Sequence, residues 1–152
     1  MKTSRIIPTT LAAMLVLVGA NSLARAETLA QDVKPLELQN IMKELGRNMQ
    51  IVTDGISRGD WALIEKTAPL IADHPQPPLL EKTRIIGFIG SDMGKFKSHD
   101  GKTHEAANAL GLAARNGDGL GVIAAFQTLQ TSCYSCHREF RKPFVEHFYG
   151  AR

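Results

Sequence analysis

Two thiols and an imidazole stand close together near the C-terminal end of the chain. They belong to the segment Cys133-Tyr134-Ser135-Cys136-His137, which has the spacing C-x-x-C-H. On a helix, positions i, i+3 and i+4 share one face, so both thiols can reach the two vinyl groups of one haem while the imidazole lies under the iron. The pattern is typical of haem attachment. We therefore predict one covalent c-type haem on Cys133 and Cys136, with His137 as the proximal axial iron ligand.

Three other uses of the two cysteines compete with haem. A redox-active C-x-x-C expects a βαβ setting, whereas the flanking sequence has helical periodicity. A structural zinc site needs four ligands; His147 could supply one, but the chain contains only 2 Cys. A plain disulfide would leave His137 without a role. Haem attachment accounts for all three side chains.

The first 26 residues have the features of a signal peptide. Lys2 and Arg5 precede an uncharged apolar run over residues 11–20, and Ala24-Arg25-Ala26 supplies the small-x-small cleavage pattern. The apolar run is too short to cross a bilayer as a helix. We expect residues 1–26 to be cleaved, which predicts a periplasmic protein with no membrane span after cleavage. An uncleaved N-terminal anchor is the alternative.

The remaining residues, 27–152, have the length of a single domain, which we expect to be a cytochrome c domain. The whole chain has 18 Lys and Arg against 15 Asp and Glu. The segment before residue 27 contains three of the basic residues and no acidic one, so the mature chain is balanced in charge. Nucleic-acid binding would need basic residues clustered on one face, and we predict none.

Apolar residues recur at steps of three and four along most of the chain, which indicates helices. The pattern and the Asp, Gly and Pro positions predict helices over residues 36–57, 61–71, 79–90, 102–116 and 120–142. The β-branched content of 79–90 would also permit a short strand. Pro143 is expected to stop the last helix, and the tail after it to fold back. These elements predict an all-α, antiparallel four-helix bundle with the haem near the C-terminal helix.

Two segments resemble the class II c-type cytochromes, the group of cytochromes c556 and c′. Residues 133–141 are similar to the family's C-x-x-C-H-x-x-aromatic-Arg ending, and residues 41–49 (IMKELGRNM) to the first helix of cytochromes c556. The resemblance implies a four-helix bundle in which the first Met of that helix, Met42, is the distal axial ligand. The expected depth of Met42 in the bundle agrees with that of His137, because in an up-down bundle the start of the first helix lies beside the end of the last. Met49 lies about 10 Å further along the helix and should miss the iron.

Four histidines could replace Met42 as the sixth ligand, since imidazole suits iron. We expect His74 to be exposed in a Pro-rich loop, His99 and His104 to flank a glycine turn, and His147 to lie in the tail.

Three cations could lie near the haem. The resemblance implies a place for Arg141 on the proximal side; a solvated cation at a helix C-terminus is equally consistent. Lys43 and Arg47 could bind a propionate, but an exposed polar face of the first helix accounts for them better.

The function predicted from these residues is electron transfer. A His/Met ligand pair raises the haem potential and leaves no open iron site, and a redox protein partner would dock weakly at the haem edge. The alternative is a five-coordinate protein of the cytochrome c′ type that binds NO or CO, and a third possibility is a structural subunit. No catalytic dyad or triad is recognisable, so we do not predict an enzyme. The resemblance also implies a possible homodimer.

Overall fold

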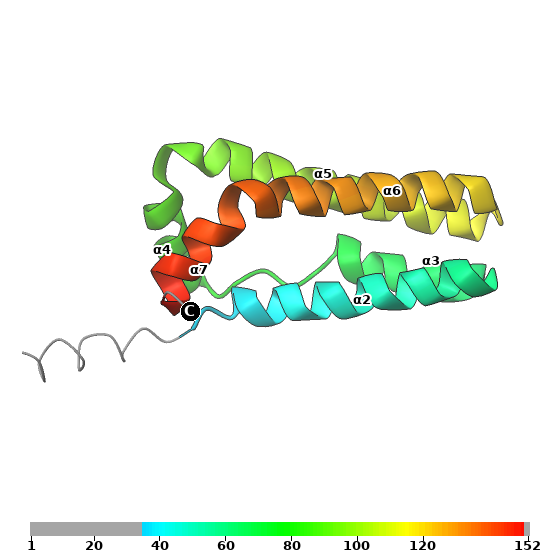
Figure 1. Cartoon of the computed structure of the whole chain (residues 1–152), viewed down its shortest axis with the longest axis horizontal. Coiled ribbons are helices and arrows are strands. Elements are labelled where there is room, and N and C mark those ends of the chain that lie inside the picture. The colour runs from blue at the N-terminus through cyan, green and yellow to red at the C-terminus, as the bar shows by residue number, and fades with distance from the viewer. Residues whose placement is uncertain (1–34, 151–152) are drawn as a thin grey trace, which may run out of the picture. The chain divides into compact units, whose positions relative to one another are not determined.

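The computed structural model describes residues 35–150, and within that range every regular element is a helix. The helices are α2 (Leu38–Arg58), α3 (Trp61–Ala72), α4 (Leu79–Ile89), α5 (Met93–Arg115), α6 (Gly119–Cys136) and α7 (Lys142–Tyr149), with a 3₁₀ turn at Gly90–Asp92 and a π-helical turn at His137–Arg141. The four long helices α2, α3, α5 and α6 run up and down as two antiparallel pairs (Figure 1). The predicted all-α four-helix bundle is confirmed. The predicted signal peptide, residues 1–26, lies outside the described residues.

Aspartates placed directly before two of the helices fix where they begin. The Asp60 carboxylate accepts a hydrogen bond from the Leu63 N–H of α3 at 3.0 Å, and Asp118 accepts one from the Gly121 N–H of α6 at 2.9 Å. Each bond satisfies one of the N–H groups that a helix start leaves without a partner. At the other end of α2, Gly59 takes a left-handed conformation with φ of 66°, which a glycine adopts without strain.

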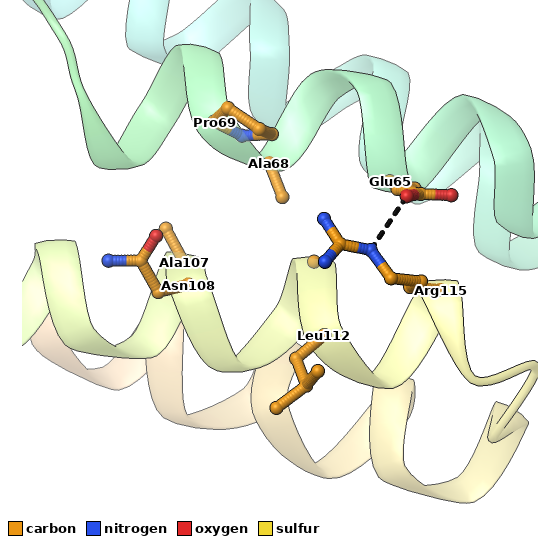
Figure 2. A pocket seen from close by; sticks show the side chains of 8 residues that line it. Glu65, Ala68, Pro69, Ala107, Asn108, Leu112 and Arg115 are labelled. Carbon is orange, nitrogen blue, oxygen red and sulfur yellow. Dashed lines mark hydrogen bonds and ion pairs between the residues drawn. The ribbon is translucent and has the colours of Figure 1, made fainter.

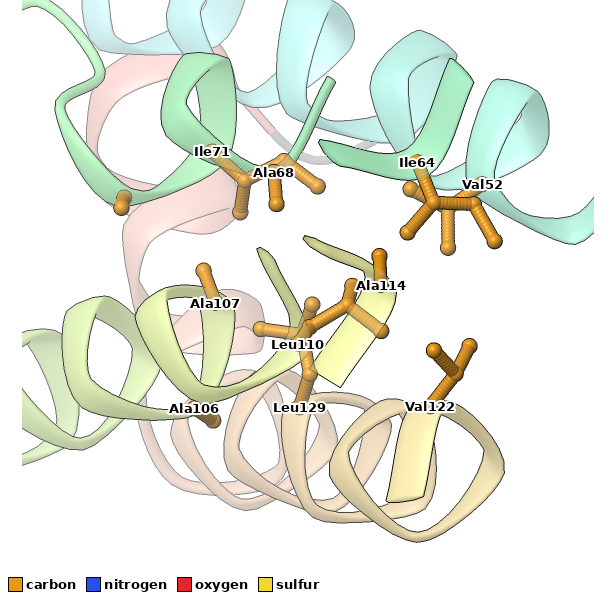
Figure 3. Packing of buried hydrophobic residues seen from close by; sticks show 11 residues of the cluster. Val52, Ile64, Ala68, Ile71, Ala106, Ala107, Leu110, Ala114, Val122 and Leu129 are labelled. Atoms are coloured by element: carbon orange, nitrogen blue, oxygen red, sulfur yellow. The ribbon is translucent and has the colours of Figure 1, made fainter. Parts of the chain in front are cut away.

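The main hydrophobic core lies between the pair α2–α3 and the pair α5–α6 (Figure 3). Its largest fully buried side chains come from all four helices: Val52, Ile64, Ile71, Leu110, Val122 and Leu129. Small residues bring α3 close to α5, since a Cβ built on Gly111 would lie 3.2 Å from the Ala68 Cβ. The apolar residues that recur at steps of three and four in the sequence therefore face one another in the bundle.

A second, smaller apolar cluster lies at the end of the bundle at which α2 begins, where α4 and α7 are also found (Figure 1). Leu36 before α2, Ile85 and Ile89 of α4, and Phe144 and Phe148 of α7 are buried there. The two phenylalanine rings lie 5.4 Å apart, and aromatic pairs at such distances are favourable. This cluster attaches the C-terminal segment to the start of α2, as the expected fold-back of the tail required.

The expected start of the third bundle helix, residue 102, was wrong, because α5 begins at Met93. Gly94 and Gly101 weaken a local helix prediction, but contacts with α6 and with the segment that follows it hold this first half. The Phe96 ring lies 5.3 Å from that of Phe140, edge to face. The residues before it form helix α4, so the alternative of a strand is also excluded.

The expected stop at Pro143 was wrong as well. After α6 the chain passes through the π-helical turn and continues as α7, with Pro143 in the first turn of that helix. Proline is tolerated at such a position, because the N–H that it lacks would have no helical partner there. The π-turn inserts an extra residue per turn and so rotates the following face, which carries Phe144 and Phe148 into the second cluster.

Candidate haem-attachment site

Both cysteines lie in the last turn of α6 and are half-buried. Cys133 packs against the main core, and Ser132 before it is buried, with its hydroxyl 3.1 Å from that of Thr103 on α5. The helical spacing of three places the second thiol one turn further, on the same side. The segment thus presents two half-buried thiols on the same side of one helix.

Burial determines the chemistry of these thiols. It raises the pKa of the Cys133 thiol, and it raises that of Cys136 to about 11, with smaller effects from the charges of Asp100, Cys133 and Glu139. Redox-active C-x-x-C cysteines have a lowered pKa, and a zinc ligand must be a thiolate. Within residues 35–150, neither cysteine belongs to a group of three side chains able to hold a metal ion. The raised pKa values are thus unlike those of redox-active C-x-x-C cysteines, and the part of the chain that the structure describes offers the two thiols no further metal ligands.

His137 directly follows α6 and is the first residue of the π-helical turn. The residue is exposed, yet the protein atoms around its ring and the Arg141 cation lower its pKa. A neutral imidazole with a free nitrogen is the form that ligates iron. π-turns inside helices are frequent at functional sites, and this one begins at the predicted ligand.

Met42 lies in the second turn of α2, and its side chain is 37% exposed. Figure 1 shows that α2 begins at the end of the bundle where α6 finishes. Met42, near the start of α2, and His137, directly after α6, are therefore carried by antiparallel helices at the same end of the bundle. Met49, two turns further along, is half-buried and packs against the main core instead.

The first turn of α2 is held by a residue from α4 that sequence reasoning missed. The two Glu81 carboxylate oxygens accept hydrogen bonds from the Glu37 N–H at 2.7 and 2.8 Å, and one of them lies 3.4 Å from the Leu38 nitrogen. A carboxylate at a helix N-terminus satisfies free N–H groups and favours the helix dipole. No local pattern signals this contact, because 44 residues separate the two partners.

The structure corrects our expectations for three of the histidines. His74 is buried rather than exposed, and its Nε2 lies 3.3 Å from Asp100. His99 and His104 do not flank a turn but lie within α5. His99 bonds to Glu139, and His104 to Asp100. His147 lies on α7 and stacks on Phe88 at 4.3 Å.

The three cations of the sequence analysis are exposed. Arg141 lies close enough to His137 for its charge to lower the pKa of the imidazole, which supports a place near the proximal side. Arg47 donates to Glu44 at 2.9 Å on the outer face of α2, in agreement with the expected solvated surface.

A small hollow of about 210 Å³ lies elsewhere, between α3 and α5 (Figure 2). It is closed at one end by the ion pair between Arg115 and Glu65, at 2.8 Å. Its lining includes no cysteine, histidine or methionine. This hollow is therefore not the haem site.

A model of the family described as cytochrome c′ matches residues 36–141, from just before α2 to the last residue of the π-turn. The chain belongs to the cytochrome c′ family. Members of this family carry one covalent c-type haem, so the chain is a haem-binding cytochrome. The donor set at the end of α6 fits that group, with two half-buried thiols one turn apart and an imidazole directly after the second.

A relative from Rhodospirillum rubrum, named cytochrome c′, is 36% identical over 62 residues. The similar stretch covers 41% of this chain and 42% of the relative. The chain thus matches less than half the length of that relative. Among the helices of residues 35–150, none combines the length and the apolarity that crossing a bilayer requires.

Proposed function

We propose that the chain is an exported electron carrier whose haem is attached through Cys133 and Cys136, with His137 and Met42 as its two axial ligands. When bound, the haem iron supplies one-electron redox chemistry. The chain's residues attach the haem, set its potential and exclude other ligands from the metal. Residues 1–26 act in this proposal as the cleaved signal that brings the chain to the periplasm, where residues 27–152 form the working domain.

Attachment needs no oxidant. Each thiol would add across one vinyl double bond of the haem, with its sulfur bonded to one carbon and its hydrogen to the other. The rigid last turn of α6 holds Cys133 and Cys136 at the necessary spacing, and both thiols are half-buried. The linkage also prevents loss of the group from a small domain.

The observation that carries the electron-transfer proposal is the position of Met42. Met42 lies near the start of α2, at the end of the bundle where α6 leads into His137, and a His/Met pair raises the haem potential. With two strong ligands, the coordination of the haem iron would change little when the iron gains or loses an electron. The partner in this proposal is a redox protein that docks transiently.

A five-coordinate protein that binds NO or CO is the second candidate, and the family match favours it. It requires Met42 to stay off the iron, and the 37% exposure of that side chain is consistent with this requirement. The two candidates make opposite predictions for one sample. A carrier keeps a six-coordinate, low-spin spectrum when its reduced form is exposed to CO, whereas the second candidate starts high-spin and binds CO rapidly.

Met42→Ala tests the assignment, and Met49→Ala is its matched control. We expect Met42→Ala to turn a low-spin spectrum into a high-spin one and to open the iron to CO. Met49→Ala removes an equal side chain that packs on the core, so it should lower stability and leave the spectrum unchanged. A low-spin, CO-resistant Met42→Ala protein would exclude Met42 as a ligand.

A further inference from the structure

A second group of metal-binding side chains lies between the end of α3 and the middle of α5, and it includes neither cysteine. It consists of His74, two residues beyond α3, and of Asp100 and His104, one turn apart on α5. Their ligand atoms all lie within 4.8 Å of one another. The two Nε2 atoms each lie 3.3 Å from a different oxygen of the Asp100 carboxylate.

The hydrogen bonds of the other two ring nitrogens fix one proton on each imidazole. His74 Nδ1 lies 3.1 Å from the Pro75 carbonyl oxygen, and His104 Nδ1 contacts the Ala72 carbonyl oxygen. A carbonyl oxygen only accepts, so each Nδ1 carries the proton, and in a neutral ring Nε2 then presents a lone pair. Metal-ligating histidines are oriented in this way by an acceptor behind the ring.

Two lone pairs and a carboxylate that face one another repel unless a positive charge lies between them. The rings are also stacked, with centroids 4.9 Å apart, which points both Nε2 atoms toward the same carboxylate. The imidazole–carboxylate group therefore has the donors, the orientation and the charge of a site for a cation.

We propose that His74, Asp100 and His104 bind one divalent transition-metal ion, of which Zn²⁺ is the best chemical fit. The three ligand atoms lie within 4.8 Å of one another, so rotations of the side chains would bring two imidazole nitrogens and one carboxylate oxygen to the bonds of about 2.0–2.1 Å that tetrahedral zinc makes. Two imidazoles and a carboxylate suit zinc and its neighbours, whereas Mg²⁺ and Ca²⁺ prefer oxygen ligands.

Burial indicates how the ion would enter and what it would do. The His74 side chain is 7% exposed, whereas His104 is 29% and Asp100 42% exposed. The site is thus open to solvent on the Asp100 side, which gives an entry path and leaves the fourth position for water. A bound ion would tie the loop between α3 and α4 to the middle of α5.

The test uses the full haem-loaded protein, stripped with a chelator and titrated with Zn²⁺ by calorimetry. We expect one Zn²⁺ per chain, no heat with Mg²⁺, and at least a tenfold loss of affinity in Asp100→Asn and in His104→Gln, since even second-shell changes cost about 10–100-fold. His99→Gln is the matched control, because His99 lies on the same helix but bonds to Glu139. An unchanged haem spectrum and circular dichroism show that each variant is folded.

Two results would overturn the proposal. One is no Zn²⁺ binding by the folded wild type, which would mean that a proton on an imidazole supplies the positive charge. The other is Zn²⁺ binding that Asp100→Asn and His104→Gln leave unchanged, which would place the ion elsewhere. X-ray absorption at the zinc edge gives an independent readout, in which we expect two imidazole ligands. Neither result depends on which residues ligate the haem iron.

Discussion

Replacing Glu81 by Ala should loosen the first turn of α2 and, with it, the proposed ligand Met42. The Glu81 carboxylate accepts from the Glu37 N–H at 2.7 and 2.8 Å, immediately before α2 begins at Leu38. Met42 follows one turn later. The substitution removes this cap while leaving every proposed haem ligand in place, so it isolates the positioning of α2 from the ligands themselves.

The size of the effect follows from the contact. Loss of a side-chain cap costs about 1 kcal/mol, and Glu81 is partly exposed, so we expect no more than that in the free energy of unfolding. If the same 1 kcal/mol is lost from the Met42-bound state, the fraction of protein with an open sixth site rises about fivefold, because 1.36 kcal/mol is a factor of ten. The CO binding rate of the reduced protein should rise in proportion.

Denaturant unfolding and stopped-flow CO binding measure the two quantities. Glu65→Ala is the control, because it also removes a carboxylate contact between helices, the 2.8 Å pair with Arg115, but at a site that includes no proposed ligand. An exposed ion pair contributes at most about 1 kcal/mol, and its loss should not change CO binding. The reasoning fails if Glu81→Ala matches the wild type in both assays, or if Glu65→Ala accelerates CO binding equally.

The remaining predictions concern the stability of the bundle and are read from chemical or thermal unfolding. In Gly55→Ala the new Cβ would lie 2.8 Å from the Ile64 Cγ1, so overpacking of about 1–3 kcal/mol should exceed the helix-propensity gain of about 1 kcal/mol and lower stability. Gly46→Ala meets nothing within 4 Å and should gain up to about 1 kcal/mol; a stabilised Gly55→Ala protein would contradict the packing described. Asp118→Ala should lose about 1 kcal/mol through the missing cap of α6, and Asp118→Asn should retain most of it; equal losses in both would show that the cap bond is not what matters.

The local sequence pattern was sufficient to predict a helix wherever a single stripe of apolar residues determines that helix. The three-and-four spacing of apolar residues predicted α2 to within two residues at each end, and the predicted helix 61–71 matches α3 to within one residue. The haem motif was placed on the last bundle helix, and its thiols lie there together with His137. These features depend on residues close together in sequence, so their physical causes are visible in it.

The wrong or missing predictions share another cause, because they concern features that depend on residues far apart in the sequence. The first half of α5 contains two glycines and is held by side chains of α6, of the π-turn and of α7, which local propensity cannot include. We predicted that the last helix would end at Pro143, because we recognised no sequence signature of the π-turn that precedes this residue. Asp100 and His104 have the i, i+4 spacing of a helix face and could have been paired if α5 had been predicted to start at Met93. His74, 26 residues earlier than Asp100 along the chain, could not.

The central claim is that one haem is bonded to the last turn of α6. Mass spectrometry of the protein, expressed from its full sequence of residues 1–152 in cells able to mature c-type cytochromes, tests it most directly. We predict a mature chain heavier by one haem after acid extraction, with the added mass on the peptide that contains Cys133, Cys136 and His137, and no haem on a protein in which both cysteines are replaced by Ala. Haem that extraction removes, or haem found on another peptide, would contradict the account.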